Sequence, residues 1–180
     1  MNQTKKQSVF RSLRHLTQAA MLTAMSVVIG IFCKSFLNFG NGLFRITFEN
    51  LPIILSGLLF GPITGGIVGV ATDLISYLLS PQTYPPNLIV TAGAFSIGLL
   101  AGLLPRITIR KRGYAQIILS GAVAHAVGSM IIKSIGLYTF YGIAVLIRIP
   151  LYLVISSVEI FIICQLLRNK SVQRLTGYEF

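Results

Sequence analysis

The sequence predicts an all-α membrane protein, a compact bundle of six transmembrane helices. Of its 180 residues, 54% are hydrophobic and 11% are charged, and the mean hydropathy is +0.79. Soluble domains carry charge on about a quarter of their residues, so this composition excludes an ordinary soluble protein. Apolar runs near the roughly 17–25 residues that cross a bilayer core follow one another along the chain. These runs are 16–36, 44–60, 62–79, 88–104, 114–136 and 145–167.

Glycine, asparagine and proline mark the breaks between these runs, because they favour turns and end helices. The first break holds Gly40, Asn41 and Gly42, and the second is the pair Gly61 and Pro62. Longer breaks follow, one of them with three prolines, at 80–87, 105–113 and 136–142. We therefore expect residues 1–180 to form a single six-helix transmembrane domain.

The net charge of +11 is explained by membrane orientation. With six crossings, the basic clusters before the first helix, between the fourth and fifth, and after the sixth all fall on one side. The excess of Lys and Arg in cytoplasmic segments places that side, and both termini, in the cytoplasm of a prokaryotic-type plasma membrane. The clusters lack interleaved aromatic residues, so we expect no nucleic-acid partner. Their members are Lys5, Lys6, Arg11, Arg14, Arg106, Arg110, Lys111, Arg112, Arg168, Lys170 and Arg174.

Four cations remain, and they lie at or near the outer ends of the predicted helices: Lys34, Arg45, Lys133 and Arg148. A long side chain near a helix end can simply reach the membrane interface, and for Lys34 this explanation is as good as a functional one. Orientation selects against outer cations, however, and the other three come from separate segments. They predict an electropositive mouth.

Polar residues recur at helical spacing, so each set lies along one face of its helix. Lipid leaves such groups without hydrogen-bond partners, and we expect these faces to turn toward the bundle interior. The sets are His125, Ser129 and Lys133; Arg148, Tyr152, Ser156 and Glu159; Gly69, Asp73 and Tyr77; and Asn87, Thr91 and Phe95.

Asp73 lies in the outer half of the third predicted helix, below the cations. It either forms an internal pair with Lys133, Arg148 or His125, or contributes one end of a ligand pocket, and a charged group within a membrane helix favours the pocket. Glu159 is nearer the cytoplasm, where a pairing role is favoured. No metal-binding, nucleophile or phosphate-binding motif is present, and we expect neither enzymatic activity nor a cofactor.

The segment FRITFENLPIILSGLLFGPITGGIVGVATDLISYLL, residues 44–79, precedes a proline-rich loop. It resembles the substrate-binding S components of energy-coupling factor (ECF) vitamin transporters, and most of all their folate-specific branch. The resemblance implies capture of a vitamin from outside, followed by association with a transmembrane coupling subunit and two cytoplasmic ATPase subunits that hydrolyse ATP. It also implies that Ala20 and Ala24 form the AxxxA motif that docks to the coupling subunit.

Folate as the ligand has consequences for individual residues. The carboxylate of Asp73 accepts two hydrogen bonds from the pterin ring in this interpretation, and Arg45, Lys133 and Arg148 receive the glutamate carboxylates. Aromatic residues supply walls or a lid, and Asn87 ends the loop where an outer gate would lie. The predicted aromatic contacts are Phe44, Tyr84, Phe95 and Tyr141.

Other ligands and functions remain open. Pantothenate and biotin each carry one carboxylate, riboflavin would leave the cations without a purpose, and thiamine would be repelled. A structural membrane subunit could bury the same charges without binding a vitamin. An intramembrane enzyme using Asp73, His125 and Glu159, or a self-sufficient secondary transporter, is less consistent with the absence of a motif or repeat.

Overall fold

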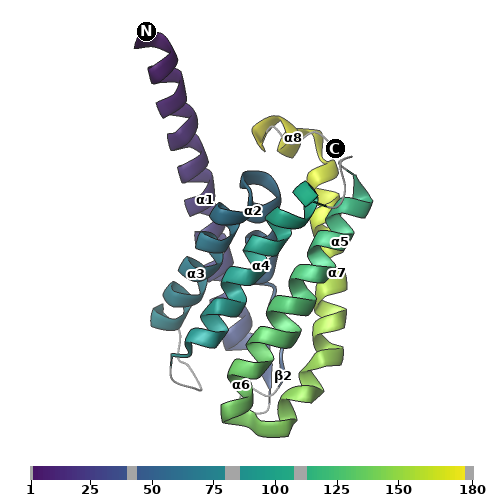
Figure 1. Cartoon of the computed structure of the whole chain (residues 1–180). Coiled ribbons are helices and arrows are strands. Elements are labelled where there is room, and N and C mark those ends of the chain that lie inside the picture. The colour runs from purple at the N-terminus through teal and green to yellow at the C-terminus, as the bar shows by residue number, and fades with distance from the viewer. Residues whose placement is uncertain (1, 40–43, 80–85, 108–112, 177–180) are drawn as a thin grey trace.

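The computed structural model describes residues 2–39, 44–79, 86–107 and 113–176 (Figure 1). Side chains are described within these ranges except for residues 2–12, 38–39, 44–45, 171 and 175–176. Helices dominate, and one short antiparallel ribbon accompanies them. The elements in chain order are α1 (Asn2–Phe36), β1 (Asn38–Phe39), β2 (Phe44–Arg45), α2 (Asn50–Phe60), α3 (Pro62–Leu79), α4 (Leu88–Ile107), α5 (Tyr114–His125), η1 (Ala126–Ile132), α6 (Lys133–Tyr141), η2 (Gly142–Ile147), α7 (Arg148–Arg168) and α8 (Lys170–Thr176).

Within the described residues, four helical stretches are long and apolar enough to cross a membrane: Leu13–Phe36, Pro62–Leu79, Leu88–Ile107 and Tyr114–Arg168. The last stretch reverses at Gly142, whose φ of 55° favours glycine, so α5, η1 and α6 form one arm and α7 returns beside it (Figure 1). The helix α2 is apolar but shorter. The predicted all-α membrane fold is confirmed.

The second predicted helix, 44–60, begins later than expected. Residues 44–45 pair with β1 instead, with Asn38 opposite Arg45 and Phe39 opposite Phe44, and α2 starts at Asn50. The run from 44 to 48 is rich in aromatic and β-branched residues, which favour extended backbone. Pro52 then lies in the first turn of α2, where its missing N–H removes no helical hydrogen bond.

The predicted break at 136–142 is also narrower than expected. Gly136 lies inside α6, and the chain turns only at Gly142. A Cβ on Gly136 would come within 3.1 Å of Ile89 and Val90 of α4. This glycine therefore serves close packing between helices, where the sequence pattern indicated a turn.

Close backbone contact joins α2, α3 and α4. A Cβ on Gly65 would lie 2.5 Å from the carbonyl oxygen of Gly98, and one on Gly102 would lie 2.5 Å from the amide nitrogen of Pro62. Small residues four positions apart let membrane helices approach in this way. The adjoining core buries Ile54, Ile97 and other aliphatic side chains, so this half of the bundle has a tightly packed apolar core.

The two ends of the bundle differ. The amino terminus, at the tip of the long α1, and the carboxyl-terminal helix α8 lie at one end, whereas α6 and β2 lie at the other (Figure 1). His15 stacks near Phe60 at a ring-centroid distance of 5.5 Å, which places the end of α2 beside the amino-terminal part of α1. The end away from the termini is the one that holds a polar cavity, and exposed cations lie at the end that carries the termini.

Replacing Gly98 with Ala should destabilise the protein, because the added Cβ would overlap the Gly65 carbonyl and separate α3 from α4. We expect a loss of about 1–3 kcal/mol in unfolding free energy, typical of an overpacked core. Thermal unfolding in detergent, followed by circular dichroism, measures it. Gly113→Ala is the matched control, since nothing lies within 4 Å of its added Cβ. Equal melting of the two variants would contradict the proposed contact.

Candidate ligand-binding site

A cavity lies at the end of the bundle away from the termini, between α1, α3, α4, η1, α6 and α7 and the segment that enters α2. The space open to the centre of a water molecule is about 70 Å³. This holds a few waters. Its polar lining includes Lys34, Thr47, Glu49, Asn50, Asp73, Tyr77, Asn87, Thr91, Ser129, Lys133, Arg148 and Tyr152.

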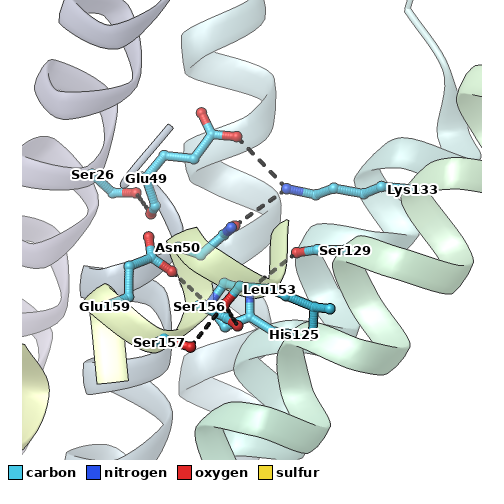
Figure 2. A network of polar contacts seen from close by, with 10 residues as sticks. All are labelled: Ser26, Glu49, Asn50, His125, Ser129, Lys133, Leu153, Ser156, Ser157 and Glu159. Carbon is cyan, nitrogen blue, oxygen red and sulfur yellow. Dashed lines mark hydrogen bonds and ion pairs between the residues drawn. The ribbon is translucent and has the colours of Figure 1, made fainter. Parts of the chain in front are cut away.

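Lys133 occupies the centre of one polar cluster (Figure 2). Its ammonium nitrogen lies 3.6 Å from Oε1 of Glu49 and donates a hydrogen bond of 3.3 Å to Oδ1 of Asn50. Both partners come from the turn into α2, and Lys133 begins α6 immediately after the π-helical segment η1. The predicted inward direction of Lys133 is confirmed, because the residue is buried.

Asp73 lies on a different part of the wall and is half-buried. Its Oδ2 accepts a hydrogen bond of 2.7 Å from the hydroxyl of Thr91 on α4. The sequence offered Lys133, Arg148 or His125 as internal partners, and the described hydrogen bond is instead to a neutral hydroxyl. A carboxylate has about four lone-pair sites, so this arrangement leaves Asp73 able to accept further hydrogen bonds from a ligand.

Asn87 lines the cavity but also holds the fold. Its Oδ1 accepts a 2.9 Å hydrogen bond from the amide of Ile89, which caps the start of α4. Its side-chain amide donates to the carbonyl of Gly136 at 2.7 Å and so ties α4 to α6. The predicted ligand contact at Asn87 therefore coincides with a structural role.

Arg148 begins α7 and is buried against the cavity. Its guanidinium carbon lies 4.8 Å from the ring centroid of Tyr141, a cation–π arrangement. Tyr141 packs with Val90, Leu137 and Val145 behind the lining. This aromatic residue supports a predicted cation, where the sequence suggested a wall or lid.

One predicted residue, Phe95, does not line the cavity. Phe95 is 38% exposed and packs on Gly66 of α3, where a Cβ would come within 2.5 Å of its ring. Its spacing from Thr91 suggested the inner face, but the space beside Gly66 receives its ring. Tyr84 and the side chains of Phe44 and Arg45 lie outside the described residues. Lys34 lines the cavity. For this residue the sequence supports a side chain that reaches the membrane interface and a functional role equally well.

A family model for the substrate-specific component of the ECF transporter matches residues 14–176. The chain belongs to this family. The transporter class and the membrane-embedded, all-helical fold that the sequence predicts are those of the ECF substrate-specific components.

Three individual proteins are similar to this chain. The folate transporter FolT of Clostridium novyi is 31% identical over 70 residues, which are 38% of this chain and 41% of that protein. The uncharacterized protein MG098 homolog of Mycoplasma pneumoniae is 30% identical over 104 residues, 53% of this chain and 21% of that one. The matches thus span less than half the length of either relative. A crystal structure of FolT bound with folic acid has the same fold, with a TM-score of 0.61, 21% identity and coverage of 92% of this chain and 94% of that chain.

Sequence reasoning missed Glu49 and Asn50 as residues of the site. The reason is the expected helix over 44–60, in which Glu49 has no special position. One signal was available: the sequence holds only four acidic residues, and one of them follows an aromatic, β-branched run at position 49. An acid that rare in an apolar chain indicates a specific partner.

A second polar pair lies deeper than the cavity. His125 Nε2 is 2.5 Å from Glu159 Oε2, and neither side chain is more than 1% exposed. Ser129, which lines the cavity, lies 3.4 Å from the other ring nitrogen of His125, so polar contacts continue from the cavity to this pair (Figure 2). The pairing role favoured for Glu159 is confirmed.

Changing His125 to Leu alone should destabilise the protein by about 3 kcal/mol or more, because Glu159 would be left buried without its partner. Changing both residues, His125→Leu with Glu159→Met, should recover much of the lost stability. Apolar residues of similar size that replace both members of a buried ion pair often leave the protein about as stable as before. Thermal unfolding in detergent measures both. A double variant less stable than the single one would contradict this interpretation of the pair.

Proposed function

We propose that this protein captures folate at the outer face of the membrane as the substrate-specific subunit of an ATP-driven ECF importer. The observation that carries the proposal is the cavity itself, in which Lys133 and Arg148 face the same space as the hydrogen-bond acceptor Asp73. Folate needs both chemistries, because its pterin ring donates hydrogen bonds and its glutamate carries carboxylates. The FolT relative and the shared fold with folate-bound FolT support the same ligand.

The orientation follows from the charge at the two ends. Exposed cations gather at the end that carries the termini, among them Arg14, Arg106, Arg168, Lys170 and Arg174. The positive-inside rule assigns this end to the cytoplasm, so the cavity opens outward. In this proposal α2 and the segment 44–49 together make the second of six crossings, because the 11 residues of α2 span only about 16 Å.

The ligand then has a definite direction in the cavity. Asp73 accepts hydrogen bonds from the pterin amino and ring N–H groups while Thr91 holds the carboxylate in place. Lys133 and Arg148 bind the glutamate end, with Arg45 and Asn87 as further contacts. Tyr77 and Tyr152 form the aromatic walls, since both line the cavity.

Transport requires partners in this proposal. A transmembrane coupling subunit and two cytoplasmic ATPase subunits supply ATP hydrolysis, and the chain itself is not an enzyme. Ala20 and Ala24 are both exposed on one side of α1, so a partner helix has direct access to the small side chains. This exposure supports the AxxxA docking role that the sequence suggested.

A vitamin with a single carboxylate, such as biotin or pantothenate, is the second candidate. Three cations and two acids line the described part of the cavity, and a monoanion is enough to balance that excess. Isothermal titration of the purified protein with folate, biotin, pantothenate, riboflavin and thiamine separates these ligands. One-to-one binding of folate without ATP supports the main proposal, and binding of biotin or pantothenate alone would replace it.

Changing Asp73 to Asn should weaken folate binding by more than tenfold, because an amide offers one acceptor oxygen where the pterin requires two. Isothermal titration against folate measures the change. Glu179→Gln removes the same charge from the carboxyl-terminal segment outside the described residues and serves as the control. Unchanged affinity in folded Asp73→Asn protein would remove Asp73 from the binding site.

Changing Ala20 and Ala24 together to Leu should abolish folate uptake by the assembled transporter while leaving folate binding by the isolated chain intact. The larger side chains keep a partner helix at a distance, but they project from the exposed side of α1. Uptake in liposomes and co-purification with the coupling subunit measure the effect. Met25→Leu, at an exposed position on the same helix, is the control. Normal uptake by the variant that carries Ala20→Leu and Ala24→Leu would contradict docking at this motif.

A further inference from the structure

We propose that Glu49 is an internal counter-anion, whose carboxylate pairs with the ammonium group of Lys133 until a carboxylate of the ligand displaces it. The inference rests on the proposed function, because it assumes a ligand with at least one carboxylate. It assigns Glu49 a role in setting affinity and in selecting acidic ligands, beyond the cations and the acceptor already named.

The first observation is the geometry of the pair. Oε1 of Glu49 lies 3.6 Å from Nζ of Lys133, and both side chains are nearly buried, with exposed fractions of 12% and 10%. Both residues also line the cavity. The contact therefore lies at the position where the carboxylate of a ligand bound to Lys133 would lie.

The second observation is that the fold holds a place for the Glu49 carboxylate. The hydroxyl of Ser26 on α1 donates a 2.5 Å hydrogen bond to the carbonyl of Glu49 and fixes the backbone there. On the same helix, Gly30 leaves room for the other carboxylate oxygen, because a Cβ at that position would come within 2.8 Å of Oε2. Helix α1 thus positions Glu49 from one side while Lys133 contacts it from the other (Figure 2).

The third observation concerns the neighbours of Lys133. Asn50 accepts a hydrogen bond from the ammonium at 3.3 Å, and this neutral contact remains available when Glu49 moves away. Lys133 carries three donors, so it can keep Asn50 and exchange one carboxylate for another. A ligand carboxylate and Glu49 repel each other at the same cation, since like charges in a low-dielectric site disfavour close approach.

Two consequences follow for the ligand. A ligand without a carboxylate has nothing to replace Glu49 at Lys133, so the pair remains closed over that part of the cavity. An acidic ligand must compete with Glu49, which lowers its affinity below the value that Lys133 alone would give. Glu49 therefore selects for acidic ligands and at the same time limits how tightly they are held.

The test is a double-mutant cycle on folate affinity, measured by isothermal titration of the purified full-length chain. Glu49→Gln keeps the size of the side chain and removes its charge, and we expect it to bind folate about three- to tenfold more tightly. In a Lys133→Gln background the same Glu49→Gln change should raise affinity by a clearly smaller factor, because the cation for which the two carboxylates compete is gone and only their direct repulsion remains. Glu179→Gln, the same change outside the described residues, should leave affinity unchanged.

Each outcome separates this inference from the proposed function. Tighter binding by Glu49→Gln that is clearly reduced without Lys133 supports displacement, and an equal gain in both backgrounds overturns it. Weaker or equal binding by folded Glu49→Gln overturns it and assigns Glu49 to direct ligand contact or to the fold. If Glu49→Gln fails to fold, Glu49→Asp is used in its place, since it withdraws the carboxylate from Lys133 and should raise affinity by a smaller factor. Absence of folate binding by the unaltered protein would instead overturn the proposed function.

Discussion

The absence of water in the bilayer core is the constraint on which the rest of this structure depends. Each polar group within the membrane must find a partner inside the protein, because hydrocarbon offers none. Polar side chains are paired along one seam, which has α5, α6 and α7 on one side and α3, α4 and the turn into α2 on the other. Glu49 and Lys133, Asp73 and Thr91, and His125 and Glu159 form successive contacts there. The cavity is the widened part of this seam at the end away from the termini.

The other half of the bundle makes the seam possible. Glycines on α2, α3 and α4 bring three backbones into direct contact and leave no room for a side chain at those positions. Tight packing of this kind resists deformation, so this half is a rigid support for the polar half. The π-helical segment η1 lies in that polar half, between His125 and Lys133, and its altered hydrogen bonding is typical of functional positions in helices.

The sequence predicted those features that depend on one element at a time. The bounds of α3, 62–79, were obtained in full because Pro62 begins the helix and a proline-rich segment follows it. The inward faces of α5, α6 and α7 followed from polar spacing. The place of Glu49 was not predicted, because it depends on the pairing of β1 with β2 and on the space left by Gly30, contacts between distant segments. Phe95 was misplaced for a similar reason: spacing gives its direction on α4, but Gly66 on α3 provides the space that its ring occupies.

The pairing of Glu49 with Lys133 also affects how a binding subunit releases its ligand. A cation left alone in a narrow, nearly buried cavity would hold an anionic ligand very strongly, because water screens the charge poorly there. With Glu49 beside Lys133, ligand binding exchanges one ion pair for another, and the net change in buried charge is small. The same exchange runs in reverse when the lining closes, since Glu49 can return to Lys133 as the ligand leaves. A transporter subunit needs this reversibility, because a ligand that is bound too tightly is never delivered.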